Sequence, residues 1–118
     1  MPNTDGAEIQ TEPVFMNVPM RGINTATNQI QVDWNTVSAP DNGDAEVTSY
    51  SLEWDASTGG ASWVSLVGYL SNYLGQTYLV TDNVIEGREY QFRLRAKNAW
   101  GWGAYSDVTT IKAAREPL

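Results

Sequence analysis

The sequence predicts an all-β protein, an antiparallel sandwich of seven short strands in one domain. Apolar and polar residues alternate most clearly in Tyr90–Lys97, and a period of two is typical of a strand with one buried face. Turn-forming residues separate the alternating segments, and none of them has the helical period of 3.6. The chain of 118 residues, 42% of them hydrophobic, is long and apolar enough for one domain with a single core.

The chain begins with a segment that is predicted to lie outside the sandwich. Residues 1–12 are polar and acidic and have no period, so they are predicted to be a tail or linker. Val14–Val18 follows between Pro13 and Pro19. Prolines are tolerated in an edge strand, where a missing N–H does no harm. The first strand is therefore predicted at Val14–Val18.

Two segments with strict alternation come next. Gln29–Trp34 and Thr48–Asp55 carry apolar residues at every second position, so each is predicted to bury one face. The predicted inward residues are Ile30, Val32, Trp34, Tyr50, Leu52 and Trp54, and the predicted outward residues of the second segment are Ser51, Glu53 and Asp55.

The rest of the chain is predicted to supply four more strands. In the second of them Leu79 is placed inward, although a slip of one residue would bury Tyr78 and Val80 instead. Residues 67–75 have no clear period, and their two tyrosines could pack on the sheet or be exposed. The four predicted strands are Trp63–Leu66, Gln76–Thr81, Tyr90–Lys97 and Asp107–Ala113.

Residues around the sixth strand carry a resemblance to a known family. An apolar residue, a turn and a tyrosine six positions later (Val84 to Tyr90) resemble the tyrosine corner of immunoglobulin-like sandwiches. The run R-A-K-N-x-x-G-W-G-x-Y-S that begins at Arg95 is similar to strands F and G of a fibronectin type III domain. The resemblance implies a seven-stranded immunoglobulin-like β-sandwich at residues 13–113, a linker at residues 114–118, and a Tyr90 hydroxyl bonded to backbone near Val84–Gly87. Other positions that fit the family are Trp34, Tyr50, Trp54, Ala96, Asn98, Gly101 and Ser106.

Composition excludes several classes of function. The chain has neither Cys nor His, so it cannot form disulfides, Cys/His zinc sites or Ser-His-Asp triads from its own residues. Its net charge of −7 argues against nucleic acid or an anionic membrane as partner. No segment approaches the 18 apolar residues of a membrane-spanning helix. We expect no catalysis, no cofactor and no membrane insertion.

The charges are unevenly distributed. Residues 1–87 contain eleven acidic residues and one basic residue, whereas residues 88–118 contain six basic and three acidic ones. One interpretation is a basic strand face paired with acidic neighbours inside one sheet, and the other is a charged face that meets a partner. The four basic residues in the densest window are Arg88, Arg93, Arg95 and Lys97.

The same region contains the predicted site. If the sixth strand pairs with Thr48–Asp55, outward Arg93 and Arg95 lie across from acidic side chains. We expect Trp102 to fold over a guanidinium, which is worth about 0.5–1 kcal/mol when exposed. This arrangement resembles the Trp/Arg stacks of cytokine-receptor fibronectin domains, although their W-S-x-W-S motif is absent. The candidate partner-binding residues are Trp100, Trp102, Tyr105, Arg93, Arg95, Asp41 and Asp44.

These observations favour a non-catalytic module over an enzyme. The predicted role is a structural spacer and protein–protein interaction or adhesion domain in a larger, multi-repeat protein at the cell surface or outside the cell, with an intracellular location left open. Its contacts would come from Asp41–Glu46 and Ala99–Tyr105. The alternative is a carbohydrate-binding accessory module that uses Trp63, Trp100 and Trp102.

Two weaker hypotheses rest on carboxylates. Asp41, Asp44 and Glu46 could serve as oxygen ligands of calcium, but Asp-Asn-Gly is typical of a tight turn. Glu53 and Asp55 form a pair of the kind that glycosidases use, but an exposed, ion-paired strand face offers no reason for a raised pKa.

Overall fold

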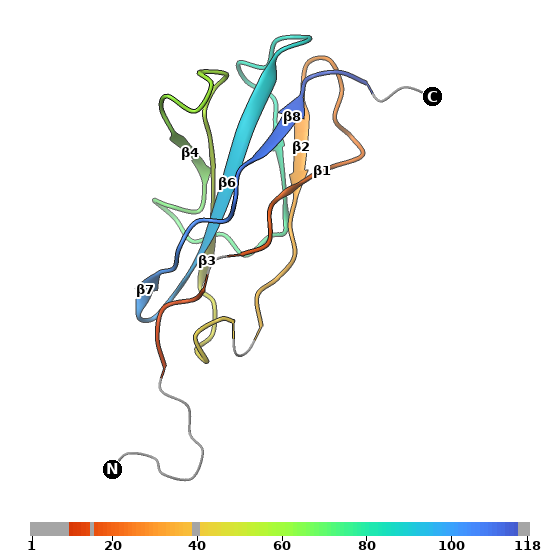
Figure 1. Cartoon of the computed structure of the whole chain (residues 1–118). Coiled ribbons are helices and arrows are strands. Elements are labelled where there is room, and N and C mark those ends of the chain that lie inside the picture. The colour runs from red at the N-terminus through yellow and green to blue at the C-terminus, as the bar shows by residue number, and fades with distance from the viewer. Residues whose placement is uncertain (1–9, 15, 39–40, 116–118) are drawn as a thin grey trace, which may run out of the picture.

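The computed structural model describes residues 10–14, 16–38 and 41–115, which form two antiparallel sheets packed face to face (Figure 1). The described residues contain no helix. The smaller sheet has the order β1-β2-β5, with bounds Met20–Arg21, Ile30–Asp33 and Thr77–Val80. The larger sheet consists of β3 (Ser49–Trp54), β4 (Val64–Val67), β6 (Glu89–Asn98), β7 (Gly101–Trp102) and β8 (Thr109–Lys112).

The larger sheet is built around β6. This strand pairs with β3 along one edge and with both β7 and β8 along the other. Between β7 and β8, the N–H groups of Gly103 and Ser106 donate to the carbonyls of Ala96 and Leu94 on β6. The two short strands are therefore two parts of one edge, and the predicted seven-stranded sandwich is confirmed.

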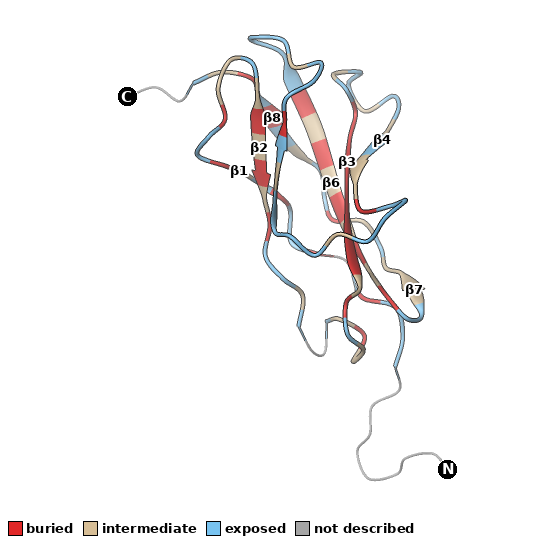
Figure 2. Cartoon of the chain, turned by 180° about the vertical axis from the view of Figure 1, so that it is seen from behind, coloured by how far each residue is buried: buried red, intermediate tan, exposed pale blue. Residues whose placement is uncertain are grey.

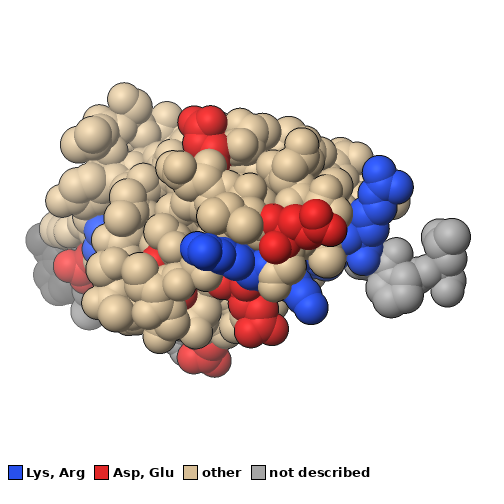
Figure 3. Space-filling model, turned by 90° about the horizontal axis from the view of Figure 1, so that it is seen from above, with Lys and Arg blue, Asp and Glu red and all other residues tan. Residues whose placement is uncertain are grey.

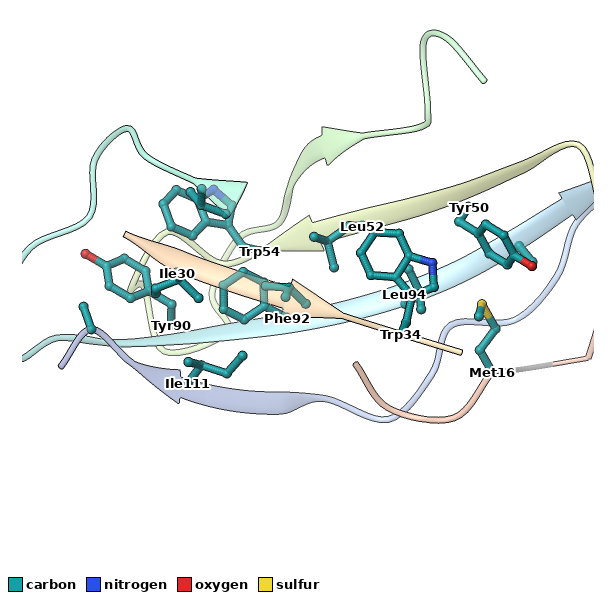
Figure 4. Packing of buried hydrophobic residues seen from close by; sticks show 14 of the residues in the cluster. Met16, Ile30, Trp34, Tyr50, Leu52, Trp54, Tyr90, Phe92, Leu94 and Ile111 are labelled. Carbon is teal, nitrogen blue, oxygen red and sulfur yellow. The ribbon is translucent and has the colours of Figure 1, made fainter. Parts of the chain in front are cut away.

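Alternation along β6 follows the predicted period of two. Tyr90, Phe92, Leu94 and Ala96 are buried, while the residues between them are half-buried, as the banding of β6 in Figure 2 shows. The buried side chains of both sheets interlock between the layers (Figure 4). The core consists of Met16, Ile30, Val32, Trp34, Val47, Tyr50, Leu52, Trp54, Val80, Tyr90, Phe92, Leu94, Ala96, Ile111 and Ala113.

The tyrosine corner fixes one end of β6. The Tyr90 hydroxyl accepts a hydrogen bond from the N–H of Ile85 (2.8 Å) and donates one to the carbonyl of Asn83 (3.1 Å). Its ring stacks on Trp54, with ring centroids 4.9 Å apart. The predicted bond between this hydroxyl and nearby backbone is confirmed.

The predicted first strand is wrong in the described residues. No ladder forms within Val14–Val18, whose Phe15 lies outside the described residues, and pairing begins only at Met20, opposite Asp33. The N–H of Val14 donates to the loop carbonyl of Asp41 instead of to a strand. Since Pro19 has no N–H to donate, the ladder starts directly after it.

Strand β5 has the register that was left as the alternative. Leu79 is 43% exposed, whereas Val80 is buried and Tyr78 packs partly against the core. The placement of Leu79 inward is therefore wrong. The pairing of Ile30 with Val80 on β2 and β5 puts both side chains on the inner face.

Candidate functional site: a cation–π ladder on the larger sheet

The outer face of β6 carries three cations in a row. The register with β3 places Arg93 opposite Glu53, while Arg95 and Lys97 lie opposite Ser51 and Ser49. Because residues two apart on a strand share a face, the three cations project from the same side of the sheet. Only the first of them therefore faces a carboxylate on β3.

Aromatic rings from the neighbouring strands and loops separate these cations. The Arg93 guanidinium carbon lies 4.3 Å from the ring centroid of Trp63 and 3.9 Å from that of Tyr105. The corresponding atom of Arg95 lies 4.6 Å from the rings of both Tyr105 and Trp102. Each distance is within the range of cation–π attraction. We call this alternating series, Trp63–Arg93–Tyr105–Arg95–Trp102, the ladder.

Two further side chains extend the ladder at its Trp102 end. The Lys97 amino group lies 5.2 Å from the Trp102 ring centroid. Tyr69 stacks on Trp102 with centroids 6.1 Å apart and lies 5.6 Å from the Arg95 guanidinium carbon. The sequence did not decide whether Tyr69 packs on the sheet or is exposed. In the structure it is half-exposed and lies beside the ladder.

Glu53 fastens the ladder to β3. Its Oε1 accepts a hydrogen bond from Nε of Arg93 (2.9 Å) and forms an ion pair with Nη2 at 2.8 Å. Its Oε2 accepts a hydrogen bond from the Tyr105 hydroxyl (2.9 Å). Burial, aided by this hydrogen bond and by the nearby charge of Glu53, raises the pKa of Tyr105 above its ordinary value. The predicted pairing of opposite charges between β3 and β6 is confirmed for Arg93.

Asp55 does not join this ion pair. It is buried at the end of β3, where its Oδ1 accepts hydrogen bonds from the N–H groups of Ser57 and Gln91 and its Oδ2 accepts one from Gly60. The expectation of an exposed, outward Asp55 across from an arginine is therefore wrong. The carboxylate holds the turn after β3, as Asp side chains commonly do.

Ser51 and Glu53 are also more buried than predicted. Both lie on the outer face of β3, yet both are buried because the side chains of the ladder cover them. A sequence cannot show this covering, since Trp63 comes from the segment before β4 and Tyr105 from the segment between β7 and β8. The irregular register between Leu52 and Glu53, opposite β4, gives no signal in the residue pattern either.

The structure divides the candidate residues into two groups. Arg93, Arg95, Trp102 and Tyr105 belong to the ladder, and the prediction that Trp102 covers a guanidinium is confirmed by its contact with Arg95. Trp100 lies at the turn between β6 and β7, 57% exposed. Its indole Nε1 donates to Oε1 of Gln10 (3.1 Å).

Trp100 and the acidic loop lie at the end of the sandwich where the described chain begins. The N–H of Thr11 donates to the carbonyl of Gly43 (3.0 Å), and the Gln10 amide donates to that of Asp44 (3.0 Å). Loop residues Asp41–Asp44 and the β6–β7 hairpin thus hold residues 10–14 between them, an arrangement we call the N-terminal clamp.

Asn98 is the centre of the N-terminal clamp. Its Nδ2 donates to the carbonyls of Thr11 (2.7 Å) and Asn42 (2.9 Å), and its Oδ1 accepts from the N–H of Trp100 (2.8 Å). The side chain is only 3% exposed. From the sequence this residue was interpreted as an ordinary position of the family run, so its bridging role was missed.

Two glycines let the N-terminal segment approach so closely. A Cβ on Gly43, which has a positive φ of 75°, would lie 2.0 Å from the carbonyl oxygen of Thr11. A Cβ on Gly103 would lie 2.0 Å from that of Pro13. Any side chain at either position would push the segment out of the N-terminal clamp.

The carboxylates of the described residues form no cluster that could hold a metal ion. Within residues 10–14, 16–38 and 41–115, no group of three or more acidic side chains could hold an ion. The N–H of Asp44 donates to Oδ1 of Asn42 (2.9 Å). This bond is typical of a tight turn, which was the alternative to a calcium site in this loop. In the described part of the chain, no helix has the length and hydrophobicity to cross a bilayer.

The paired antiparallel sheets, the tyrosine corner and the β6 edge define an immunoglobulin-like sandwich. The sequence profile of the fibronectin type III domain matches residues 13–112. The chain therefore belongs to the fibronectin type III family.

Solved structures show the same fold at low sequence identity. The fourth FNIII domain of a human protein superposes with a TM-score of 0.76 at 16% identity, over 96% of this chain and 88% of that one. The sixth domain of human fibronectin type III domain containing protein 3 gives 0.70 at 21% identity, over 92% of each chain. Titin domains A168–A170 give 0.67 at 22% identity, over 88% of this chain and 33% of theirs.

The family narrows the class of function. Fibronectin type III domains are generally non-catalytic, and they are commonly structural and protein-interaction modules of multidomain chains. This chain spans only a third of the titin fragment that it resembles.

Proposed function

We propose that this chain is a non-catalytic module that serves as a structural spacer and as a protein–protein interaction or adhesion domain of a larger, multi-repeat protein. The extracellular or cell-surface location predicted from the sequence belongs to the same proposal. The observation that carries the proposal is the position of the two chain ends.

The described chain enters and leaves at opposite ends of the sandwich (Figure 1). At one end the N-terminal clamp holds Gln10–Val14. At the other end Nη1 of Arg21 donates to the carbonyl of Lys112 (2.9 Å) and Nη2 donates to that of Ala114. Strand β6 runs between these ends, and its ten residues span about 34 Å. Both ends are thus fixed to the body, as a spacer that transmits force requires.

The ladder supports the interaction part of the proposal. Large aromatic residues and Arg dominate the binding energy of many protein interfaces. Here they lie half-buried on the outer face of one sheet, held in place by their mutual contacts. Among the residues that the structure describes, Glu53 forms an ion pair with Arg93 and with no other cation of this face, so the face keeps a local positive charge.

Stretching a tandem of four copies of this chain in a force microscope tests the spacer role. Each copy is expected to unfold in one step and to lengthen the tether by roughly 350 Å. This is the extended length of 118 residues at about 3.3–3.6 Å per residue, less the folded length of 57 Å. Asn98→Ala is expected to lower the unfolding force because it weakens the end to which the load is applied. Lengthening without discrete steps would reject the spacer role.

The carbohydrate alternative rests on Trp100. The rings of Trp63 and Trp102 are each occupied by a guanidinium, whereas Trp100 has a 57% exposed side chain that could stack on a sugar ring. Binding on a glycan array that is lost in Trp100→Ala would favour this alternative over a protein partner.

A further inference from the structure

The register of the larger sheet leaves two cations of the outer face without a counter-charge. Serines, not carboxylates, lie opposite Arg95 and Lys97 on β3. Within the described part of the chain, the one ion pair on this face joins Arg93 to Glu53, and no carboxylate lies within 4.0 Å of the other two cations. In a chain of net charge −7, this pair of cations is a local exception.

The two cations are also held in place. The Arg95 guanidinium lies between the rings of Tyr105 and Trp102, and the Lys97 amino group lies near the Trp102 ring. Nε of Arg95 is buried against these rings without a hydrogen-bond partner in the described residues. The loss of side-chain freedom that binding normally requires has therefore largely occurred already, and such preorganisation strengthens binding.

We propose that Arg95 and Lys97 bind an acidic segment of a partner protein, in an extended conformation with carboxylates at every second residue. This inference rests on the proposed role as an interaction module and names the partner's chemistry. Cations two apart on β6 are separated by about 6.8 Å, and carboxylates two apart on an extended peptide have the same spacing. The flanking Trp102 and Tyr69 rings supply apolar surface beside the charges.

A short acidic peptide fits this site better than a sulfated polysaccharide. Two unpaired cations match two carboxylates, whereas a highly charged polymer would extend beyond them. The interaction between exposed charges is largely screened beyond about 8–10 Å at physiological salt. A polyanion long enough to reach past the two cations therefore leaves the range of their attraction and meets the rest of a chain whose net charge is −7.

An NMR titration of the whole ¹⁵N-labelled chain tests the proposal. The probes are the peptide Thr-Glu-Thr-Glu-Thr-Glu and its Gln analogue, at 50 mM and 500 mM salt, and the reporter is the indole N–H of Trp102. The Glu peptide is expected to shift this signal at low salt, and the Gln analogue is expected to leave it unchanged. Lys97→Gln is expected to weaken binding roughly two- to fivefold, the effect of one exposed ion pair.

The matched control is Lys112→Gln. Lys112 is an exposed cation on β8. It lies opposite Glu89 at the start of β6, whereas Lys97 lies near the other end of that strand, so the loss of Lys112 is expected to leave binding unchanged. Figure 3 shows acidic and basic side chains mixed on the end of the molecule that lies uppermost in Figure 1.

Three results would overturn the proposal: equal shifts with the Glu and Gln peptides, equal weakening by both Lys variants, or no binding of the Glu peptide. A heparin oligosaccharide that binds through Lys97 more tightly than the Glu peptide would also overturn it, in favour of a polysaccharide. If the NMR titration gives one of these results while the tandem still unfolds stepwise under force, only the acidic partner is rejected. Loss of the force steps rejects the spacer role, whatever the peptide does.

Discussion

Replacing Asn98 by Ala tests the N-terminal clamp. The Asn98 side chain makes three hydrogen bonds, two donated to the carbonyls of Thr11 and Asn42 and one accepted from the N–H of Trp100. The first two bonds join Asn98 to segments that are distant in the sequence, and the third shapes the turn between β6 and β7. Because the side chain is 3% exposed, water cannot readily replace the lost partner.

The expected cost follows from the number of bonds. Each is worth about 1 kcal/mol net, and an unsatisfied buried partner adds to the loss. Asn98→Ala is therefore expected to reduce the free energy of unfolding by about 3 kcal/mol. For a domain of this size that corresponds to a fall in Tm of about 12–15 °C.

Urea denaturation followed by tryptophan fluorescence measures this loss. The matched control is Asn72→Ala, in an exposed loop, which is expected to change stability by less than about 0.5 kcal/mol. Deleting residues 1–12 removes the carbonyl of Thr11, so Asn98→Ala is expected to cost about 1 kcal/mol less in the shortened chain. A cost below about 1 kcal/mol in the full chain, or an equal cost in both chains, would refute the bridging role of Asn98.

Three further predictions concern the core and the ladder. Tyr90→Phe removes the corner hydrogen bonds and is expected to cost about 0.5–1.5 kcal/mol, and an unchanged denaturation midpoint would contradict it. Trp34→Ala leaves a cavity between the sheets and is expected to cost about 3–5 kcal/mol, so a melt without a drop in stability would refute its core position. Burial, with the hydrogen bond to Glu53, raises the pKa of Tyr105 above the ordinary value of a tyrosine. The folded state therefore holds this proton more tightly, and the resulting stabilisation is complete below pH 10 and lost as the pH rises further. Tyr105→Phe is expected to make the decline in stability between pH 9 and 11 shallower in denaturation curves, and identical slopes would contradict this.

The parts of the fold that depend on local pattern could be predicted from the sequence. Burial of alternate residues on β6 follows from its period of two, and the corner at Tyr90 follows from the spacing to Val84. The contact of Trp102 with an arginine was also predictable, since the β6–β7 hairpin is short and pairs Trp102 directly with Lys97.

The parts that depend on contacts between distant segments could not be predicted. The first strand was placed too early because the N-terminal segment pairs with a loop instead of a sheet. Leu79 was placed inward because a four-residue strand has too few alternations to fix its register. The position of Trp63 against Arg93 and the buried turn at Asp55 both need three-dimensional neighbours that no periodicity reveals.

The ladder links the fold to the proposed function. Glu53 neutralises the first cation and orients Tyr105, which in turn stacks on Arg95. The same contacts that stabilise the outer face thus leave positive charge at its far end.

Site-directed photo-crosslinking in the protein as its cells produce it tests most directly whether the ladder face meets a protein partner. A photoreactive residue at Ala104, exposed between Trp102 and Tyr105, is compared with one at Ile23, which is 92% exposed at the opposite end. We predict a discrete protein adduct from position 104 that weakens when Lys97→Gln is added, and none from position 23. Equal adducts from both positions, or an adduct from position 23 alone, would contradict the account.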